Sequence, residues 1–306
     1  MIRVENLVKT YGPVHALDGL SLNVEPGAVY GFLGPNGAGK TTSMRILSGL
    51  ARPDSGRAWI LDKEIGASGQ DVRSLIGVLP EEPSFYGWMT PREYLRDFVA
   101  PLFGIQGQVA NKRTDELLEV VGLKDDANRR LGGFSRGMRQ RMGIAQALVH
   151  KPPVLLLDEP VSALDPAGRK EVLDLIETLR GQTTILLSTH ILADVERVCD
   201  VIGIIAKGRL IVQARRDELL ASYVTPLFEI ESDNGFGHWL EWVEKQAFVT
   251  KVTVSNHTAR VLVKDVHEAQ NPLLESLARA ALQVRRFEMI HPSLEDVFLR
   301  LTEKEV

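Results

Sequence analysis

The chain contains a glycine-rich stretch that is suited to bind phosphate, Gly34-Pro35-Asn36-Gly37-Ala38-Gly39-Lys40-Thr41. It fits the phosphate-loop pattern G-x-x-x-x-G-K-[ST] at every fixed position. Glycines let backbone N–H groups point at phosphate oxygens, and a following helix adds partial positive charge. Lys40 can then reach the β- and γ-phosphates, and the Thr41 hydroxyl can bind Mg²⁺. The stretch, extended to Thr42, therefore predicts a nucleoside triphosphate site.

Two acids follow an apolar segment further along the chain. Asp158 and Glu159 come directly after Val154–Leu157, and ligands of open α/β sheets lie at the carboxyl ends of strands. Asp158 is suited to hold Mg²⁺ through water, and Glu159 to polarise the water that attacks the γ-phosphate. Alone, such a pair is more often a solvated turn or a helix cap. The phosphate loop in the same chain favours the catalytic interpretation.

A histidine closes a third apolar segment. His190 follows Thr184–Ser188, where an imidazole could donate to the γ-phosphate and hold the geometry between Glu159 and the attacking water. A lone histidine at a strand end is more often a surface or capping residue. Its position after the acid pair favours a functional role.

Strand and helix patterns alternate around these residues, which predicts an α/β fold with a mostly parallel sheet. Residues 1–25 alternate apolar and polar positions around a turn, which predicts an antiparallel strand pair. An inserted helical subdomain is predicted for about 91–151, where strand signal is weak. The expected buried strands are Ala28–Leu33, Val154–Leu157 and Thr184–Ser188, and the expected helices are Glu93–Phe103, Asn111–Val121, Gly137–His150, Leu164–Arg180 and Ile191–Val198.

The pattern changes after Val212, so we predict two domains, 1–216 and 217–306. The second has the β-α-β-β-α-β order of a small α+β ferredoxin-like domain. Its expected strands are Leu227–Glu231, Val249–Ser255, Arg260–Lys264 and Val284–Met289, its expected helices are His238–Gln246 and Pro272–Leu282, and a capping box of Ser293 and Asp296 is expected to open Leu294–Leu301.

Composition limits the function classes. The 306 residues are 44% hydrophobic and 25% charged, with a net charge of −4 that argues against a nucleic-acid partner. The lone Cys199 excludes an internal disulfide framework. No signal-peptide pattern or membrane-spanning run is found, so we expect a cytoplasmic protein that reaches the membrane only through a partner.

The segment Phe134-Ser135-Arg136-Gly137-Met138-Arg139-Gln140-Arg141 carries a specific resemblance. With the motifs above it resembles an ATP-binding-cassette (ABC) ATPase, whose signature reads Leu-Ser-Gly-Gly-Gln; Ser135 and Gly137 match, while Phe134, Arg136 and Met138 depart. The resemblance covers about residues 1–216 and implies a P-loop NTPase (RecA-like) core. It also implies that Ser135 and Gly137 bind the γ-phosphate held by the other protomer.

Other roles are implied position by position. Tyr11 matches the aromatic residue that stacks on adenine, and Ser162–Asp165 matches a loop that communicates across the dimer. Glu81 falls where the family usually has a glutamine that touches Mg²⁺ at the hinge to the helical subdomain. Phe85–Arg92 would line the groove that faces a membrane subunit.

Glu81, the departing signature and the tail Pro292–Phe298 are similar to one branch of the family, single-cassette ATPases that partner separate type-2 export permeases. The resemblance thus implies a homodimer, or a pseudo-dimer with a related subunit, that closes around two Mg-ATP on the cytoplasmic face of a permease. Two alternatives stay open: a non-transport ABC ATPase in translation or DNA repair, and an importer subunit. A kinase or GTPase is weaker, because the guanine-reading Asn-Lys-x-Asp fails at Asn111–Thr114. The transported substrate is not readable.

Overall fold

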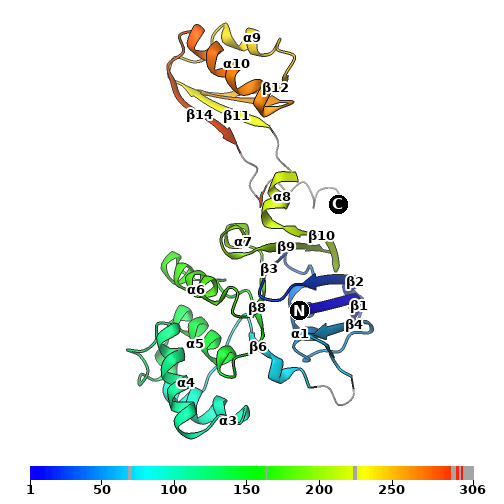
Figure 1. The fold of residues 1–306 in the computed structure, drawn as a ribbon, viewed down its shortest axis with the longest axis vertical. Helices are drawn as coiled ribbons and strands as arrows, with labels where there is room; N and C mark the ends of the chain where they lie inside the picture. Colours follow the sequence, from blue (N-terminus) through cyan, green and yellow to red (C-terminus); the bar gives the residue numbers. More distant parts are fainter. Residues whose placement is uncertain (68–70, 163, 223–225, 291–293, 296–297, 299–306) are drawn as a thin grey trace. The chain divides into compact units, whose positions relative to one another are not determined.

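The computed structural model describes residues 1–67, 71–162, 164–222, 226–290, 294–295 and 298. The chain divides into two compact units, Met1–Arg216 and Asp217–Val306, drawn in Figure 1. No helix in the described part of the chain is long and apolar enough to span a membrane.

A six-stranded sheet forms the centre of the first unit. Its order is β10-β9-β3-β8-β7-β6, parallel from β9 to β6, with β10 antiparallel at one edge. Every residue of β3, β7 and β8 is buried, as expected for parallel strands covered on both faces. The strands are β3 (Val29–Leu33), β6 (Ile76–Leu79), β7 (Val154–Asp158), β8 (Thr184–Thr189), β9 (Val201–Ala206) and β10 (Arg209–Arg215).

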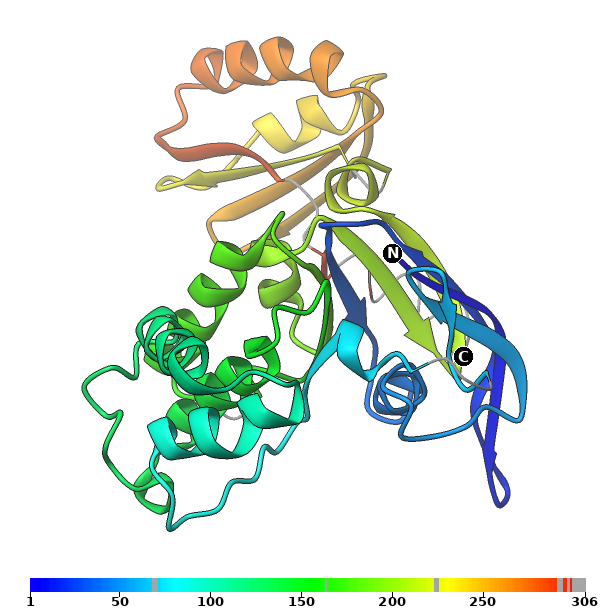
Figure 2. The same cartoon turned by 60° about the horizontal axis from the view of Figure 1, so that its bottom comes forward.

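A second, antiparallel sheet has the order β2-β1-β4-β5. The predicted strand pair at the N-terminus is present as β1 and β2, which Tyr11 and Val14 close as a register pair. Helix α1 packs against this sheet and against the central one, and its apolar residues join both in one core, as Figure 2 shows for the blue helix beside the blue strands. The bounds are β1 (Ile2–Tyr11), β2 (Val14–Val24), α1 (Lys40–Leu47), β4 (Ser55–Ile60), β5 (Lys63–Glu64) and a 3₁₀ turn at Arg73–Leu75.

Helices α2 to α5 lie within the predicted helical insertion. Helices α6 and α7 follow it in the sequence and belong to the α/β core (Figure 1). One difference is local: the expected helix Glu93–Phe103 contains a π-helical stretch, Tyr94–Val99, between two short α-helical turns. The bounds are α2 (Pro91–Glu93), α3 (Ala100–Leu102), α4 (Gly107–Val120), a 3₁₀ turn at Leu131–Gly133, α5 (Arg136–Leu148), α6 (Pro166–Leu179) and α7 (Leu192–Val198).

The second unit is a four-stranded antiparallel sheet of order β12-β13-β11-β14, with α9 and α10 packed on one face through a core that includes Phe228, Ile230 and Trp239. This arrangement matches the predicted ferredoxin-like order. The bounds are α8 (Arg216–Ser222), β11 (Leu227–Ser232), α9 (Trp239–Val243), β12 (Val249–Ser255), β13 (Thr258–Val263), α10 (Val266–Arg279) and β14 (Val284–Ile290).

The largest error in a predicted helix boundary is at the start of α10. The sequence suggested a helix starting at Pro272, but α10 begins at Val266, because Asp265 caps it by accepting from the backbone N–H groups of His267 and Glu268. Pro272 lies inside the helix. The predicted capping box of Ser293 and Asp296 lies outside the described residues.

We expect Gly203→Ala to destabilise the first unit. An ideal Cβ at Gly203 in β9 would lie 2.0 Å from the hydroxyl oxygen of Tyr30, and this fully buried tyrosine is held by a 3.0 Å hydrogen bond to Gln213. Overpacking of this kind costs about 2 kcal/mol. The urea midpoint should fall, whereas Gly133→Ala, whose nearest atoms lie 3.7 Å away, should leave it unchanged. Equal midpoints for the two variants would contradict the expectation.

Candidate functional site

The glycine-rich stretch forms a loop between β3 and α1. Gly39 immediately precedes α1 with a left-handed backbone, φ +111°, and an ideal Cβ there would lie 2.6 Å from the carbonyl oxygen of Ala16. Both facts require glycine. Lys40, the first residue of α1, is 6% exposed, and its ammonium group donates to the carbonyl oxygens of Gly34 at 2.6 Å and Pro35 at 3.3 Å. The loop therefore curls around a buried cation.

The acid pair lies where β7 ends, and β8 holds it in place. Asp158 and Glu159 are both 6% exposed. The Glu159 N–H donates to the carbonyl oxygen and to the hydroxyl of Ser188, each at 3.1 Å, while the Ser188 hydroxyl donates to Asp158 Oδ1. Glu159 has a positive φ of +46°, which turns its side chain out of the strand direction. Ser188 thus fixes both carboxyl-bearing residues.

Lys40, Glu159 and His190 form a continuous polar network. The Lys40 ammonium lies 3.5 Å from Glu159 Oε1, and His190 Nδ1 lies 2.9 Å from Glu159 Oε2. Because the two contacts involve different carboxylate oxygens, they fix the plane of the Glu159 carboxylate as well as its position. The Thr41 hydroxyl extends the arrangement to Asp158 Oδ1, at 3.5 Å.

A pocket of about 330 Å³ opens over this network. Its lining joins the phosphate loop to the side chains predicted at the other strand ends, so the structure brings most of the predicted site together. The lining residues are Val14, Ala16, Pro35, Asn36, Gly37, Gly39, Lys40, Thr41, Thr42, Glu81, Glu159 and His190. A neighbouring hollow of about 430 Å³ shares Thr41 and Glu81 with it and adds Asp158.

Six predicted residues do not line this pocket. Gly34 and Ala38 belong to the phosphate loop and Asp158 lines the neighbouring hollow, and the other three are Tyr11, Ser135 and Gly137. Tyr11 ends β1 with 45% of its surface exposed, and the nearby Val14 and Ala16 of β2 line the pocket instead. Ser135 is exposed and caps α5, where its hydroxyl accepts from the Met138 N–H at 3.2 Å. Gly137 is the second residue of that helix. A single chain therefore does not bring Ser135 and Gly137 to its own pocket.

An ion pair fixes the helix that follows His190. Arg169 of α6 donates to Asp194 of α7 at 2.6 Å, and Asp194 is 1% exposed. Burial raises the pKa of Asp194 above its ordinary value, and the charge and hydrogen bond of Arg169 oppose that change. Arg169 thereby links the helix after the predicted Ser162–Asp165 loop, of which Ala163 lies outside the described residues, to the segment that carries His190.

Sequence reasoning missed three residues of this site. The sequence places Ser188 only in a strand, because the alternation of polar and apolar residues does not reveal a hydroxyl that bridges two acids. Val14 and Ala16 were read as part of the β1–β2 pair. The sequence carries no signal for these two, because the approach of Ala16 to Gly39 is set by the fold.

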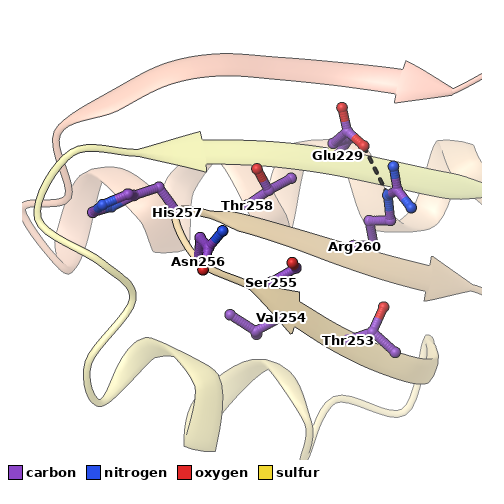
Figure 3. A pocket seen from close by; sticks show the side chains of 8 residues that line it. All are labelled: Glu229, Thr253, Val254, Ser255, Asn256, His257, Thr258 and Arg260. Carbon is purple, nitrogen blue, oxygen red and sulfur yellow. Dashed lines mark hydrogen bonds and ion pairs between the residues drawn. The ribbon is translucent and has the colours of Figure 1, made fainter.

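The second unit has a separate pocket of about 550 Å³ at the tip of the β12–β13 hairpin. Figure 3 shows the side chains that line it, with Glu229 and Arg260 pointing toward each other from paired positions on β11 and β13. The two side chains form an ion pair, with 2.8 Å between Arg260 Nε and Glu229 Oε2. None of the predicted site residues lies in this pocket.

Comparison with known families agrees with this geometry. Residues 17–162 match the family described as ABC transporter, and residues 215–302 match the family described as ATP-binding protein DrrA1-3-like, C-terminal domain.

Three similar proteins illustrate the match. The uncharacterized ABC transporter ATP-binding protein YxlF of Bacillus subtilis is 41% identical over 302 residues, 98% of this chain and 99% of that protein. The daunorubicin resistance ATP-binding protein DrrA3 of Streptomyces coeruleorubidus is 36% identical over 98% of this chain and 95% of its own length. A solved dimeric ATP-binding cassette, in a post-hydrolysis state with ADP and Pi, aligns with a TM-score of 0.63 and 27% identity over 70% of this chain and 98% of that one.

The central parallel sheet, the phosphate loop and the acid pair define a P-loop ATPase. Within that class, the chain belongs to the ABC transporter family of ATP-binding proteins. The predicted family and the predicted fold class are both confirmed.

We expect Ser188→Ala to lower ATP hydrolysis about tenfold, because the loss of one buried hydroxyl frees both Asp158 and the Glu159 backbone from their common partner. Steady-state phosphate release measures the effect. Thr183→Val is the matched control, since it removes a buried hydroxyl that donates at 2.9 Å to the Pro152 carbonyl, at the opposite end of the strand. A Ser188→Ala rate equal to the control's would show that Ser188 does not position the acids.

Proposed function

We propose that this protein is the ATP-hydrolysing subunit of an ABC exporter, and that two copies close around two Mg-ATP to drive a separate membrane permease. The observation that carries the proposal is the network of Lys40, Glu159 and His190 at the wall of the phosphate-loop pocket. A buried cation and an oriented carboxylate, placed beside the phosphate loop, are parts that phosphoryl transfer to water requires.

In this mechanism the loop N–H groups and Lys40 bind the β- and γ-phosphates of ATP. Glu159 orients a water molecule and accepts its proton while the water oxygen bonds to the γ-phosphorus. The bond from that phosphorus to the bridging oxygen breaks, and ADP leaves with the electron pair. His190 holds the Glu159 carboxylate through Nδ1, which leaves Nε2 to face the γ-phosphate. Most of the rate enhancement then comes from positioning and charge stabilisation.

The donor set fits Mg²⁺. The Thr41 hydroxyl and Asp158 Oδ1 are hard oxygen donors 3.5 Å apart, and Glu81 lines the same two hollows. No group of three or more His, Cys, Asp or Glu side chains within the described ranges could hold a metal by itself, as expected for an ion that relies on phosphates and water for most of its ligands. When bound, Mg²⁺ would neutralise charge on the β- and γ-phosphates.

The dimer is supported by the signature helix. Ser135 is exposed at the N-terminus of α5, a 13-residue helix whose first N–H groups can bind an anion. Because Ser135 and Gly137 do not line the pocket of their own chain, we assign them to the γ-phosphate of a second copy. The solved cassette with ADP and Pi is itself dimeric.

The permease is supported by a cluster of exposed aromatic side chains. Tyr86 contacts both Trp88 and Phe98, with ring centroids 5.9 and 5.2 Å apart, and all three are exposed. Exposed apolar patches are features of protein interaction sites. Export as the direction is supported by the similar daunorubicin resistance protein and by a 42% identical protein of Bacillus licheniformis named for bacitracin transport.

We expect Glu159→Gln to bind ATP, to accumulate as a dimer and to hydrolyse ATP at least 100-fold more slowly, because the amide cannot accept the proton of the attacking water. Size-exclusion chromatography with light scattering and phosphate release measure the two effects. Glu177→Gln, which changes an exposed carboxylate on α6, is the control. Near-normal turnover in Glu159→Gln would remove Glu159 from the proposed role.

Co-purification tests the transport role directly. The tagged full-length chain, extracted in detergent from its native cells, should retain a multi-span membrane protein. Trp88→Glu should abolish that retention while ATP binding stays intact, because a charge cannot be buried in an apolar interface. Val109→Glu, an equally exposed apolar residue on α4, is the control and should retain the partner. If no multi-span protein is recovered with the unaltered chain, the non-transport ATPase becomes the better hypothesis.

A further inference from the structure

Helix α5, which begins beside the signature residue Ser135, lies unusually close to β6 and the segment that continues it to Glu81. An ideal Cβ at Gly77 in β6 would lie 2.2 Å from the carbonyl oxygen of Ala147 in α5. An ideal Cβ at Gly143 in α5 would lie 2.4 Å from Leu79 Cδ1 and 3.3 Å from Pro83 Cβ. Glycine at both positions permits this approach. The second half of α5 is therefore held against β6 and the segment that follows it.

Gln140 makes the polar contact at this approach. Its side chain is 1% exposed, and its amide nitrogen donates to the Glu81 carbonyl oxygen at 2.9 Å. Since a carbonyl oxygen only accepts, the amide nitrogen must face it. Gln140 Oε1 is buried without a hydrogen-bond partner among the described residues, so the donor side of the amide makes the specific interaction.

A second contact joins the same two segments. Arg136, in the first turn of α5, lies 3.7 Å from Glu82 Oε1. Both side chains are largely exposed, and exposed ion pairs contribute little. The buried hydrogen bond from Gln140 is therefore the main polar link between the signature helix and Glu81.

We propose that Gln140 is a positioning residue for ATP hydrolysis: its amide holds the Glu81 backbone so that the signature helix and this wall of the nucleotide pocket are placed as one unit. The proposal rests on the proposed function. Glu81 lines the pocket together with Lys40, Glu159 and His190, whereas the phosphate loop itself makes no contact with Gln140 among the hydrogen bonds of the described residues. Loss of the link should thus lower turnover and leave nucleotide affinity nearly unchanged.

Gln140→Glu tests the donor directly. The carboxylate keeps the size and shape of the amide but places a negative oxygen against a carbonyl oxygen, so we expect kcat to fall about tenfold at pH 8.5. A buried carboxyl group has a raised pKa, and once protonated it can donate to the Glu81 carbonyl. The ratio of its kcat to that of the unaltered protein should therefore recover several-fold as the pH falls to 6.5. The charged residues on the segments that meet at position 140 include Glu81, Glu82 and Arg136. Their titration and that of His190 affect kcat of both proteins alike, so the ratio of the two kcat values at each pH removes these effects.

Two further variants complete the design. Gln140→Leu has no donor in any protonation state, so its kcat ratio should stay low and independent of pH. Gln146→Glu places the same substitution further along α5, where the side chain accepts from the Tyr94 hydroxyl at 3.0 Å and a carboxylate can still accept. Its kcat should remain within about twofold of the unaltered protein at every pH. KM for ATP and binding of ADP should change less than twofold in the two Gln140 variants.

The outcomes separate the two proposals. An active unaltered protein with a pH-dependent Gln140→Glu defect and a pH-independent Gln140→Leu defect supports the positioning role. If kcat falls equally in Gln140→Glu and Gln140→Leu at every pH, with a matching fall in melting temperature, Gln140 has a purely structural role and the positioning role is wrong. Unchanged turnover in both variants would also overturn the positioning role. If the unaltered full-length chain hydrolyses no ATP with Mg²⁺, the proposed function itself fails.

Discussion

The Lys40 ammonium lies 3.5 Å from the Glu159 carboxylate at the nucleotide pocket. This contact depends on the order of the strands in the sheet more than on any local motif. Lys40 follows β3 and Glu159 follows β7, and these strands are not neighbours: β8 lies between them. The strand that comes last of the three in sequence therefore occupies the middle in space. Its carboxyl end supplies Ser188 and His190, which contact the residues from β7.

This arrangement explains why the central strands are so completely buried. A carboxylate and an ammonium that are each 6% exposed are stable only as a well-placed pair, because the cost of removing charges from water is repaid by accurate geometry. The apolar residues of β3, β7 and β8 supply that accuracy by holding the carboxyl ends of the three strands in fixed register. The electrostatics of the site therefore depend directly on how well the sheet is packed.

The sequence was sufficient for features with strong local signals and insufficient for those set by tertiary contacts. The phosphate loop, the Asp158-Glu159 pair and His190 each follow an apolar strand, so their meeting at one sheet edge was predictable. The start of α10 was missed because Pro272 is a strong helix-start signal, while the Asp265 cap seven residues earlier decides the boundary. Ser188 was missed because nothing in the pattern of a buried strand reveals which hydroxyl will bridge two acids. The catalytic and binding roles of the site residues, among them Tyr11, Ser135 and Glu81, remain predictions.

The backbone of Glu159 carries a consequence for how this chain can vary. At φ +46° a non-glycine residue costs about 1 kcal/mol, and glycine or asparagine would adopt this conformation more easily. Such a replacement would also leave the Lys40 ammonium buried without its carboxylate partner, and an unpaired buried charge costs more than this backbone strain. The backbone and the ion pair therefore favour different residues at position 159, and the ion pair decides which residue folds best.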